Sequence, residues 1–496
     1  MPLPDLIEIV PLGKAVWAEI TVPGSKSITN RALVLATLAD GQTKLPGALW
    51  SEDTQIMVEC LRRLGFEVAV EPDPEEFCNR TITVNGLGGR IPRGGTAAQP
   101  LELFVGNAGT AARFLAALVC LGDGVYRLHG TPRMHERPQA ALLQALRELG
   151  YRVETDNQND RLPAKIFGGG TSEIRSPRSE ETPKSEISNL QSEIDPNRLA
   201  SGAAAENPPR SCTVSIEESS QFASALLLCA SAGGWNVKIT GENAEESPYV
   251  ALTTKMIEAF PPGGGTFQIE PDASSGSYFW AAGNHLGHSF TVTVANWPNS
   301  GWQPDQGFHV VLHVLHGAFN SPGGYGAFGN QSPRGFSFPA GISRQKHLGD
   351  SVMTAIVLAS LLAREQIKFL GVDALRFTDL GRLRVQECER VTALRTELTR
   401  CGAKVVEEGD TLTVFPSADH MHGAEIETYH DHRMAMCFAI LGLKVPGIKI
   451  KNPACVKKTF PNFFQKLAAP PPRGLGATIR DAATGRQLTH DELFAD

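Results

Sequence analysis

The chain lacks a Cys-x-x-Cys pair, although nine cysteines are scattered over its 496 residues. An odd number of cysteines without a regular framework favours free thiols in a reducing compartment over disulfides. We expect most of them to be small core residues, because Cys120, Cys229 and Cys437 lie within apolar runs. No group of histidine and cysteine residues has the sequence spacing of a zinc site, so we expect no bound metal.

Long apolar runs and an excess of positive charge are also missing. The apolar runs are all shorter than the roughly 20 residues that a membrane-spanning helix needs. The segment Met1–Asp5 lacks the charged and apolar regions of a signal peptide. With 46 basic and 53 acidic residues the net charge is -7, which argues against nucleic-acid binding. We therefore expect a cytoplasmic protein with no membrane or nucleic-acid partner, in which any anion site is local.

The length allows two or three domains with cores of their own. Residues 168–210 are rich in Ser, Glu, Pro and Asn, which predicts a disordered insertion. Residues 317–347 are rich in Gly, Ser, Pro and Phe, which predicts a long surface loop. Residues 469–496 contain a triple proline near their start, which predicts a peripheral tail, with a possible hairpin at Ile479–Leu488.

What the chain does contain is six places where small polar residues precede a small or apolar stretch. A helix N-terminus offers unpaired N–H groups and the positive end of the helix dipole. Six helix starts that point at one place would form an anion-binding site. The predicted helix starts are Ser25–Ser27, Asn107–Thr110, Ser219–Gln221, Ser274–Ser275, Asp350–Ser351 and His430–Arg433.

A second pattern recurs in Leu61–Val68, Leu146–Val153 and Leu398–Val405. Each reads as the end of an amphipathic helix, a glycine that can adopt a left-handed conformation, and a strand. The glycines are separated by 85 and 252 residues, close to one and three copies of a single period. Such joints are common in α/β proteins, but the matched spacing favours repeated β/α units. Because several helices are apolar on more than one face, we expect buried helices and outer sheets.

Cations accompany several of these helix starts. Lys26 and Arg31 lie in the first turns of a helix, where a cation is unfavourable unless an anion joins it. Arg133 and Arg137 flank a loop, and arginine suits the bidentate recognition of carboxylate or phosphate. Taken singly, each motif could be an ordinary capped helix or a solvated loop. The first is not a P-loop, because Gly-x-x-x-x-Gly-Lys is absent.

Seven strings, taken in order, resemble the 5-enolpyruvylshikimate-3-phosphate (EPSP) synthase family: GSKSITNRAL, GNAGTA, PRMHERP, SSQF, DASSGSYF, DHRMAM and KKTFP. The resemblance runs from Val22 to Leu467 and is interrupted by the two unusual segments. It implies a two-domain α/β enolpyruvyltransferase fold with three βαβαββ units per domain and buried parallel helices. The implied domains are residues 21–270 and residues 1–20 plus 271–468, with the active site in the cleft between them.

The resemblance also implies an activity and its site residues. The substrates would be phosphoenolpyruvate and shikimate 3-phosphate, with no metal or organic cofactor, a monomeric enzyme, and inhibition by glyphosate. Asp350 would be the base for the acceptor hydroxyl, Glu387 the proton-transfer carboxylate and Lys26 a further catalytic group. The implied phosphoenolpyruvate contacts are Lys26, Gly109, Thr110, Arg133, Gln221, Arg390, Arg433 and Lys458. The implied shikimate 3-phosphate contacts are Lys26, Ser27, Arg31, Ser219, Ser220, Gln221, Tyr249, Asp350 and Gln386.

The chain departs from the family pattern at four positions. Gln386 stands where the family usually has Lys, Arg382 where it has Asn, and Glu246 where it has Ser. Phe114 replaces a proline. These changes leave open a non-catalytic or altered-acceptor paralogue that binds an anionic metabolite. A second alternative is UDP-N-acetylglucosamine enolpyruvyltransferase, which uses a loop cysteine before its Arg-Pro pair; here no cysteine precedes Pro138 closely.

Overall fold

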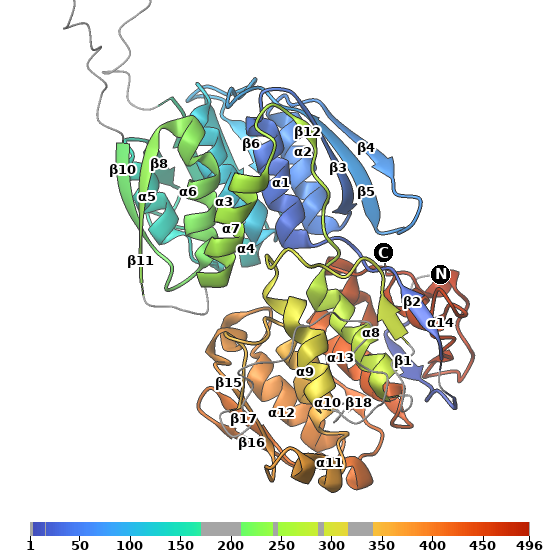
Figure 1. Ribbon diagram of the computed structural model, residues 1–496. Helices are drawn as coiled ribbons and strands as arrows, with labels where there is room; N and C mark the ends of the chain where they lie inside the picture. Colours follow the sequence, from blue (N-terminus) through green and yellow to red (C-terminus); the bar gives the residue numbers. More distant parts are fainter. Residues whose placement is uncertain are drawn as a thin grey trace, which may run out of the picture.

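The computed structural model describes residues 3–14, 16–169, 210–241, 247–285, 292–315 and 341–495. Most of the predicted insertion and of the predicted surface loop lie outside these ranges. The chain forms two lobes, one above the other in Figure 1. We call residues 24–270 the first lobe, and residues 3–22 with 272–495 the second lobe.

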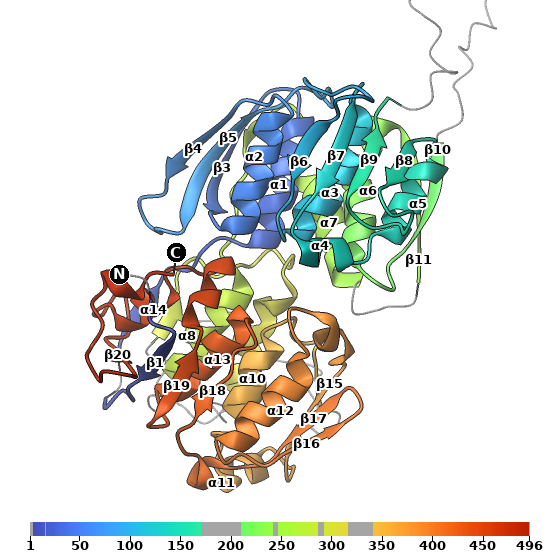
Figure 2. The ribbon, with the colours of Figure 1, turned by 180° about the vertical axis from the view of Figure 1, so that it is seen from behind.

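The first lobe is an α/β arrangement of helices and outer strands, with helices in front in Figure 1 and strands in front in Figure 2. Its helices are α1 (Lys26–Leu38), α2 (Glu52–Arg63), α3 (Gly109–Leu118), α4 (Pro132–Glu136), α5 (Ala140–Glu148), α6 (Ser220–Gly233) and α7 (Ser247–Ala259). Its strands are β3 (Gln42–Leu49), β4 (Val68–Pro72), β5 (Asn79–Asn85), β6 (Leu101–Phe104), β7 (Val125–His129), β8 (Arg152–Thr155), β9 (Ala164–Phe167), β10 (Arg210–Ser215), β11 (Trp235–Thr240) and β12 (Gly265–Thr266).

The second lobe repeats this arrangement. Its helices are α8 (Ala273–His285), α9 (Phe308–Leu315), α10 (Val352–Ala359), α11 (Arg364–Phe369), α12 (Arg390–Arg400), α13 (His432–Gly442) and α14 (Phe463–Ala468), with short 3-10 turns η2 (Pro304–Gly307), η5 (Gly381–Val385) and η7 (Pro453–Lys458). Its strands are β1 (Leu6–Ile9), β2 (Ala18–Ile20), β13 (Val292–Val294), β14 (Ile342–Ser343), β15 (Leu375–Thr378), β16 (Val405–Glu408), β17 (Thr411–Val414), β18 (Glu425–Ile426), β19 (Ile448–Lys451) and β20 (Ile479–Asp481).

The predicted βαβαββ unit is confirmed in both lobes. In the sheet β6-β7-β9-β8, β6 and β7 are parallel, and β9 is antiparallel to β7 and β8. The sheet β14-β15-β17-β16 has the same order and directions. Two other units borrow a distant strand: β12 completes the sheet of β3, and β1 joins β19. These borrowed strands pair segments that lie far apart in the sequence.

All six predicted helix starts are confirmed, since α1, α3, α6, α8, α10 and α13 begin within or next to the predicted segments. The predicted helix–glycine–strand joints are confirmed too. Gly65, Gly150 and Gly402 have φ angles of 93°, 86° and 90°, a left-handed conformation that side chains other than glycine rarely adopt.

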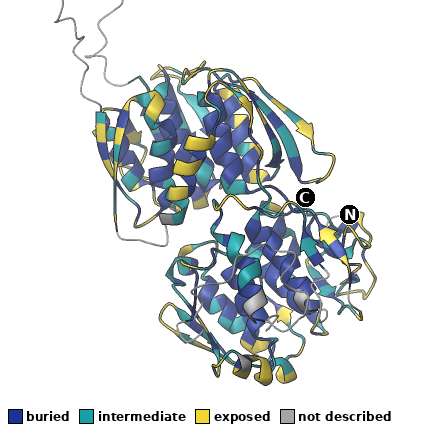
Figure 3. Ribbon diagram, viewed as in Figure 1, coloured by how far each residue is buried: buried dark blue, intermediate teal, exposed yellow. Residues whose placement is uncertain are grey.

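Buried residues fill the interior of each lobe (Figure 3), and the apolar ones form two separate clusters. One contains residues from Ile28 to Ile269, and the other combines Leu3–Val22 with Tyr278–Ala495. Every residue of α10 is buried, as expected for a helix enclosed by its neighbours. Among the described residues, no helix is both long and apolar enough to cross a membrane.

The prediction of a peripheral tail at 469–496 was wrong. Strand β20 pairs with β1 and extends the sheet of the second lobe. Leu475, Ile479, Leu488 and Leu493 are buried in the core cluster of this lobe. The composition of the tail is polar, but its few apolar residues fall where the strand and the following turn face the core. The possible hairpin is confirmed at one bridge, between Arg480 and Gln487.

A buried carboxylate ties the lobes together at one side. Glu76, between β4 and β5, accepts hydrogen bonds from Thr21 and Asn462, both at 2.7 Å. The ammonium group of Lys466 lies 2.7 Å from the same carboxylate. Because Thr21, Asn462 and Lys466 all belong to the second lobe, these contacts hold Glu76 of the first lobe against it.

Candidate active site

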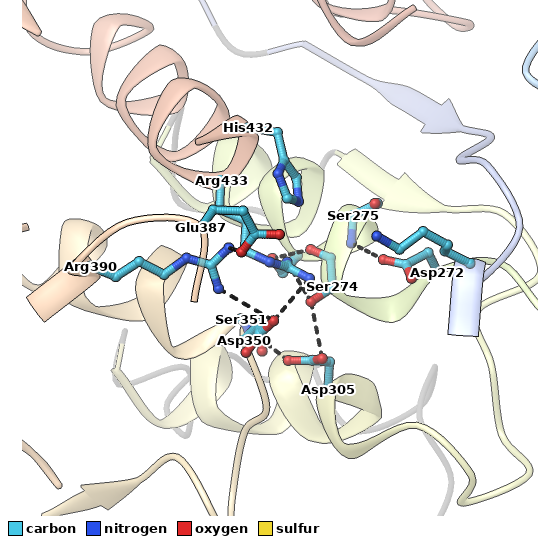
Figure 4. A network of polar contacts seen from close by, with 12 residues as sticks. Asp272, Ser274, Ser275, Asp305, Asp350, Ser351, Glu387, Arg390, His432 and Arg433 are labelled. Atoms are coloured by element: carbon cyan, nitrogen blue, oxygen red, sulfur yellow. Dashed lines mark hydrogen bonds and ion pairs between the residues drawn. The ribbon is translucent and has the colours of Figure 1, made fainter. Parts of the chain in front are cut away.

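Five charged side chains meet at helix ends of the second lobe: Asp350, Glu387, Arg390, Arg433 and Lys458 (Figure 4 labels the first four). Asp350 Oδ2 lies 3.2 Å from Arg433 Nη2 and 3.7 Å from Arg390 Nη1. Glu387 Oε2 lies 2.6 Å from Arg390 Nη2, and its other oxygen lies 2.8 Å from Lys458 Nζ. The structure thus brings together all the second-lobe residues proposed for catalysis and phosphoenolpyruvate binding.

Asp431 explains why Arg390 and Arg433 lie side by side. Its side chain caps α13 by accepting a hydrogen bond from the backbone N–H of Arg433 at 2.8 Å. The same carboxylate accepts a 2.7 Å hydrogen bond from Arg390 Nε, at the start of α12. Asp431 is fully buried and Arg390 is only 1% exposed, so the pair is shielded from water. One capping residue therefore fixes the Arg390 guanidinium next to the backbone of Arg433.

The carboxylates of Asp350 and Glu387 are both held in the ionised state. Burial by itself would raise the pKa of Asp350, but Arg433, Arg344 and Arg390 outweigh it and hold that pKa below its usual value. Burial likewise opposes ionisation of Glu387, and Arg390 and Lys458 hold the pKa of this carboxyl well below its usual value. The cations of the site are thus neutralised by the protein's own carboxylates.

A second buried carboxylate, Asp305, lies behind Asp350 (Figure 4). Ser274 donates a 3.0 Å hydrogen bond to Asp305, and Arg433 donates a 2.7 Å hydrogen bond to Ser274. The backbone N–H of Ser351 also donates to Asp305, at 2.6 Å. Burial and the charge of Asp350 raise the pKa of Asp305. Sequence patterns did not single out Asp305, because it stands alone in a short Gln-Pro-Asp segment.

The first lobe contributes the start of α1. Lys26 Nζ lies 3.2 Å from Asp53 Oδ2, and the lysine side chain is 22% exposed. Arg31 is buried and donates to the hydroxyls of Thr253 at 2.7 Å and Ser224 at 3.1 Å, and to the carbonyl of Ser27 at 2.9 Å. Burial lowers the pKa of Arg31 to about 10. Arg31 therefore binds three internal partners, while Lys26 stays accessible.

The start of α6 carries the polar residues predicted to bind the acceptor. Ser219 caps the helix by accepting a hydrogen bond from the backbone N–H of Gln221 at 3.2 Å. Ser219 and Ser220 are buried, and the side-chain oxygen of Gln221 accepts a hydrogen bond from Arg113. Arg113 also lies over the ring of Phe222, 5.1 Å from its centre, which fixes the guanidinium.

The structure places the two arginines around α4 differently. Arg133, which the family resemblance assigns to phosphoenolpyruvate binding, has a side chain that is 67% exposed and lies 2.6 Å from Glu136. Arg137 instead donates a 3.1 Å hydrogen bond to the carbonyl of Asn107. A Cβ added to Gly109 would lie 2.6 Å from the Arg137 guanidinium. The sequence motif contains both arginines and does not tell which one lies beside Gly109. The structure shows that it is Arg137.

The charged groups of the two lobes act on each other. Lys26 helps to lower the pKa of Glu387, and burial, opposed by Glu387 and Asp53, lowers the pKa of Arg137. Arg382 Nη1 donates a 2.8 Å hydrogen bond to the backbone carbonyl of Glu218, directly before Ser219. Two carboxylates and several cations therefore face one another across the boundary between the lobes, an arrangement suited to proton transfer on an anionic substrate.

The remaining predicted residues lie around this boundary. Thr110 follows Gly109 in the first turn of α3, and Gln386 follows η5. Tyr249 and Arg344 line a small crevice between the lobes. Glu246 lies outside the described residues.

Within the part of the chain that the structure describes, no three His, Cys, Asp or Glu side chains gather in a group that could hold a metal ion.

Comparison with known proteins agrees with the motifs. The family model for EPSP synthase (3-phosphoshikimate 1-carboxyvinyltransferase) matches residues 10–184 and 261–467. The 3-phosphoshikimate 1-carboxyvinyltransferase of Opitutus terrae is 34% identical over 495 residues, covering 94% of this chain and 98% of that protein. The Vibrio cholerae protein of the same name is also 34% identical, covering 91% of this chain and 96% of its own length.

Solved structures share the fold. EPSP synthase from Acinetobacter baumannii superposes with a TM-score of 0.66 at 19% identity, over 96% of this chain and all of the other. The enolpyruvyl transferase NikO from Streptomyces tendae gives a TM-score of 0.57 at 13% identity, over 98% of this chain and all of the other. With the fold, the ordered motifs and relatives at this level of identity, the chain belongs to the EPSP synthase family.

Proposed function

We propose that this protein transfers the enolpyruvyl group of phosphoenolpyruvate to the 5-hydroxyl of shikimate 3-phosphate and releases phosphate. The observation that carries the proposal is the pair of ionised carboxylates, Asp350 and Glu387, held by Arg390, Arg433 and Lys458. A carboxylate must be ionised before it can act as a general base and accept a proton. An anionic substrate also needs positively charged side chains that can bind it. Both requirements are met at one place.

In this mechanism Asp350 takes the proton of the 5-hydroxyl, and the resulting oxygen attacks C2 of phosphoenolpyruvate. The methylene carbon C3 takes a proton from Glu387, which has taken it from solvent in the substrate complex, and this gives a tetrahedral intermediate. Breaking the bond between C2 and the phosphate oxygen then releases phosphate, which takes the proton held by Asp350, while C3 returns a proton to Glu387 to form the enol ether. Arg390 and Lys458 hold Glu387 ionised in the free protein. When the substrate recruits these cations, Glu387 loses partners and its pKa rises, so it can carry the proton.

The remaining contacts are proposed from the family motifs. For phosphoenolpyruvate they are Lys26, Gly109, Thr110, Arg133, Gln221, Arg390, Arg433 and Lys458. For shikimate 3-phosphate they are Lys26, Ser27, Arg31, Ser219, Ser220, Gln221, Tyr249, Asp350 and Gln386. The buried hydroxyls at the start of α6, at the positive end of the helix dipole, suit a phosphate group.

Three further proposals follow from the same assignment. Residues 21–270 form one domain and residues 1–20 with 271–468 the other, in agreement with the two apolar clusters. The enzyme works in the cytoplasm, which suits nine cysteines that are all free. It acts as a monomer, because the implied site uses residues of one chain only.

The test is to mix the purified protein with both substrates, measure phosphate release, and identify the enol ether by mass spectrometry. We expect both products to form in equal amounts, and neither to form when shikimate 3-phosphate is left out. Asp350→Asn and Glu387→Gln should each lower kcat by about 100-fold or more. Glu408→Gln changes an exposed carboxylate of the same lobe and serves as the control. Binding of phosphoenolpyruvate without any product would favour the non-catalytic paralogue.

A further inference from the structure

Arg344 touches the proposed base from the side opposite the phosphoenolpyruvate cations. Its Nη2 donates a 2.9 Å hydrogen bond to Asp350 Oδ1, whereas Arg433 and Arg390 approach Oδ2. The Arg344 side chain is only 3% exposed. The two oxygens of one carboxylate thus have separate cationic partners.

The backbone around Arg344 is anchored to the sheet. Arg344 follows β14, and its backbone N–H donates to the carbonyl of Thr378 in the neighbouring β15 at 3.1 Å. The backbone N–H of Ser343 donates to His347 Nδ1 at 2.9 Å, which closes the turn that leads to Asp350. Arg344 and Asp350 therefore stand at the two ends of one fixed turn.

Arg390 and Arg433 differ from Arg344 in what else they contact. Arg390 also binds Glu387, and Arg433 binds Ser274, so both belong to the group of cations proposed to receive phosphoenolpyruvate. Once an anionic substrate recruits them, their hold on Asp350 weakens. Asp305, which carries the same charge as Asp350 and lies close to it, then favours protonation of Asp350, and Arg344 opposes it.

We propose that Arg344 is a positioning residue that keeps Asp350 ionised and oriented after phosphoenolpyruvate has drawn Arg390 and Arg433 away. This inference rests on the proposed function. In the substrate complex, Arg344 is the cation that still pairs with the base. Its removal should raise the pKa of Asp350 in that complex, because an opposite charge at hydrogen-bond distance favours the ionised carboxyl.

The test measures kcat at saturating substrates from pH 4.5 to 9 for wild type, Arg344→Met and Arg344→Lys. The profile of kcat reports the groups that ionise in the substrate complex. In Arg344→Met we expect the acid limb to move up by about one pH unit or more. Arg344→Lys, which retains a positive charge, should recover at least part of the shift. Arg376→Met changes an exposed arginine on β15 and should leave the profile unchanged.

Three results would overturn the inference while leaving the proposed function intact. The first is a fall of kcat by the same factor at every pH. The second is a lysine variant no better than the methionine variant. The third is a higher KM for shikimate 3-phosphate with an unmoved acid limb, which would make Arg344 a substrate ligand. If Arg344→Met does not fold, Arg344→Gln replaces it in the comparison. If the wild-type protein releases no phosphate, the proposed function is rejected, and this inference is rejected with it.

Discussion

Arg382 donates a 2.8 Å hydrogen bond from its guanidinium to the backbone carbonyl of Glu218, and so links the second lobe to the start of α6 in the first. Glu218 directly precedes the serines proposed to bind the acceptor. Removing this hydrogen bond should weaken the binding of shikimate 3-phosphate more than the binding of phosphoenolpyruvate. We therefore predict that Arg382→Ala raises the KM for shikimate 3-phosphate more than the KM for phosphoenolpyruvate.

Gln386 lies near this link, where a lysine would add a charged hydrogen bond. Such a bond is worth roughly 1.5–3 kcal/mol, or about 10- to 100-fold in affinity. Because Arg382 already supplies positive charge nearby, Gln386→Lys should tighten shikimate 3-phosphate binding only modestly. The measurement that tests both predictions is the KM for each substrate in Arg382→Ala and Gln386→Lys, with Arg395→Ala as a control away from this link. If neither variant changes the KM for shikimate 3-phosphate, neither residue faces that substrate.

Gly109→Ala should weaken glyphosate strongly and phosphoenolpyruvate less. The added Cβ would lie 2.6 Å from the Arg137 guanidinium, so the arginine must move. Glyphosate is longer than phosphoenolpyruvate, so we expect it to tolerate a narrowing of the site next to Gly109 less well than the substrate does. Inhibition constants measured in competition with phosphoenolpyruvate provide the check. Gly263→Ala is the control, because its added Cβ has no atom within 4 Å. Equal inhibition of wild type and Gly109→Ala would contradict the prediction.

Glu76→Ala should destabilise the protein by about 3 kcal/mol, because it leaves Lys466 without its partner in a largely buried site. Glu76 is 2% exposed and accepts hydrogen bonds from Thr21 and Asn462 as well. Urea unfolding, followed by fluorescence, gives the difference in unfolding free energy. The neighbouring Glu75 is exposed, and Glu75→Ala should change stability by less than about 0.5 kcal/mol. A similar loss of unfolding free energy in both variants would show that Glu76 does not hold the two lobes together.

Stability should fall as the pH drops below about 6.5, partly because of His432. Burial, together with Arg433 and Lys458, holds the pKa of His432 well below 6.5, despite the opposing charges of Asp431 and Glu387. The unfolded chain takes up a proton in this range while the folded chain does not, so acid favours unfolding. His432→Asn should reduce the slope of unfolding free energy between pH 7.5 and 5.5. The exposed His420→Asn should leave the slope as in wild type.

Replacing residues 171–206 by a short Gly/Ser link should leave the melting temperature and turnover nearly unchanged. The reason is compositional, since this stretch carries too little apolar surface to offset the entropy of ordering. These residues lie outside the described ranges, so the prediction stands on the sequence alone. A clear loss of melting temperature or turnover would show that the segment packs against a lobe.

Local elements and family membership follow from the amino-acid sequence. Helix starts, helix–glycine–strand joints and ordered motifs depend on neighbouring residues, and a residue such as Gly402 must be glycine because of its own φ angle. For the same reason, the fold class and the residues Asp350, Glu387, Arg390 and Arg433 could be predicted from sequence patterns. Their motifs place each of them at or near the start of a particular helix.

Which side chains meet depends on the tertiary structure. Arg133 and Arg137 share one motif, and the packing of α4 places the second beside Gly109. The tail looked peripheral because its strand has no partner nearby in sequence; β1, at the other end of the chain, supplies one. Glu76, Asp305 and Arg344 carry no recognisable motif. Their roles arise from contacts between segments far apart along the chain, or across a fixed turn, which local sequence patterns do not encode.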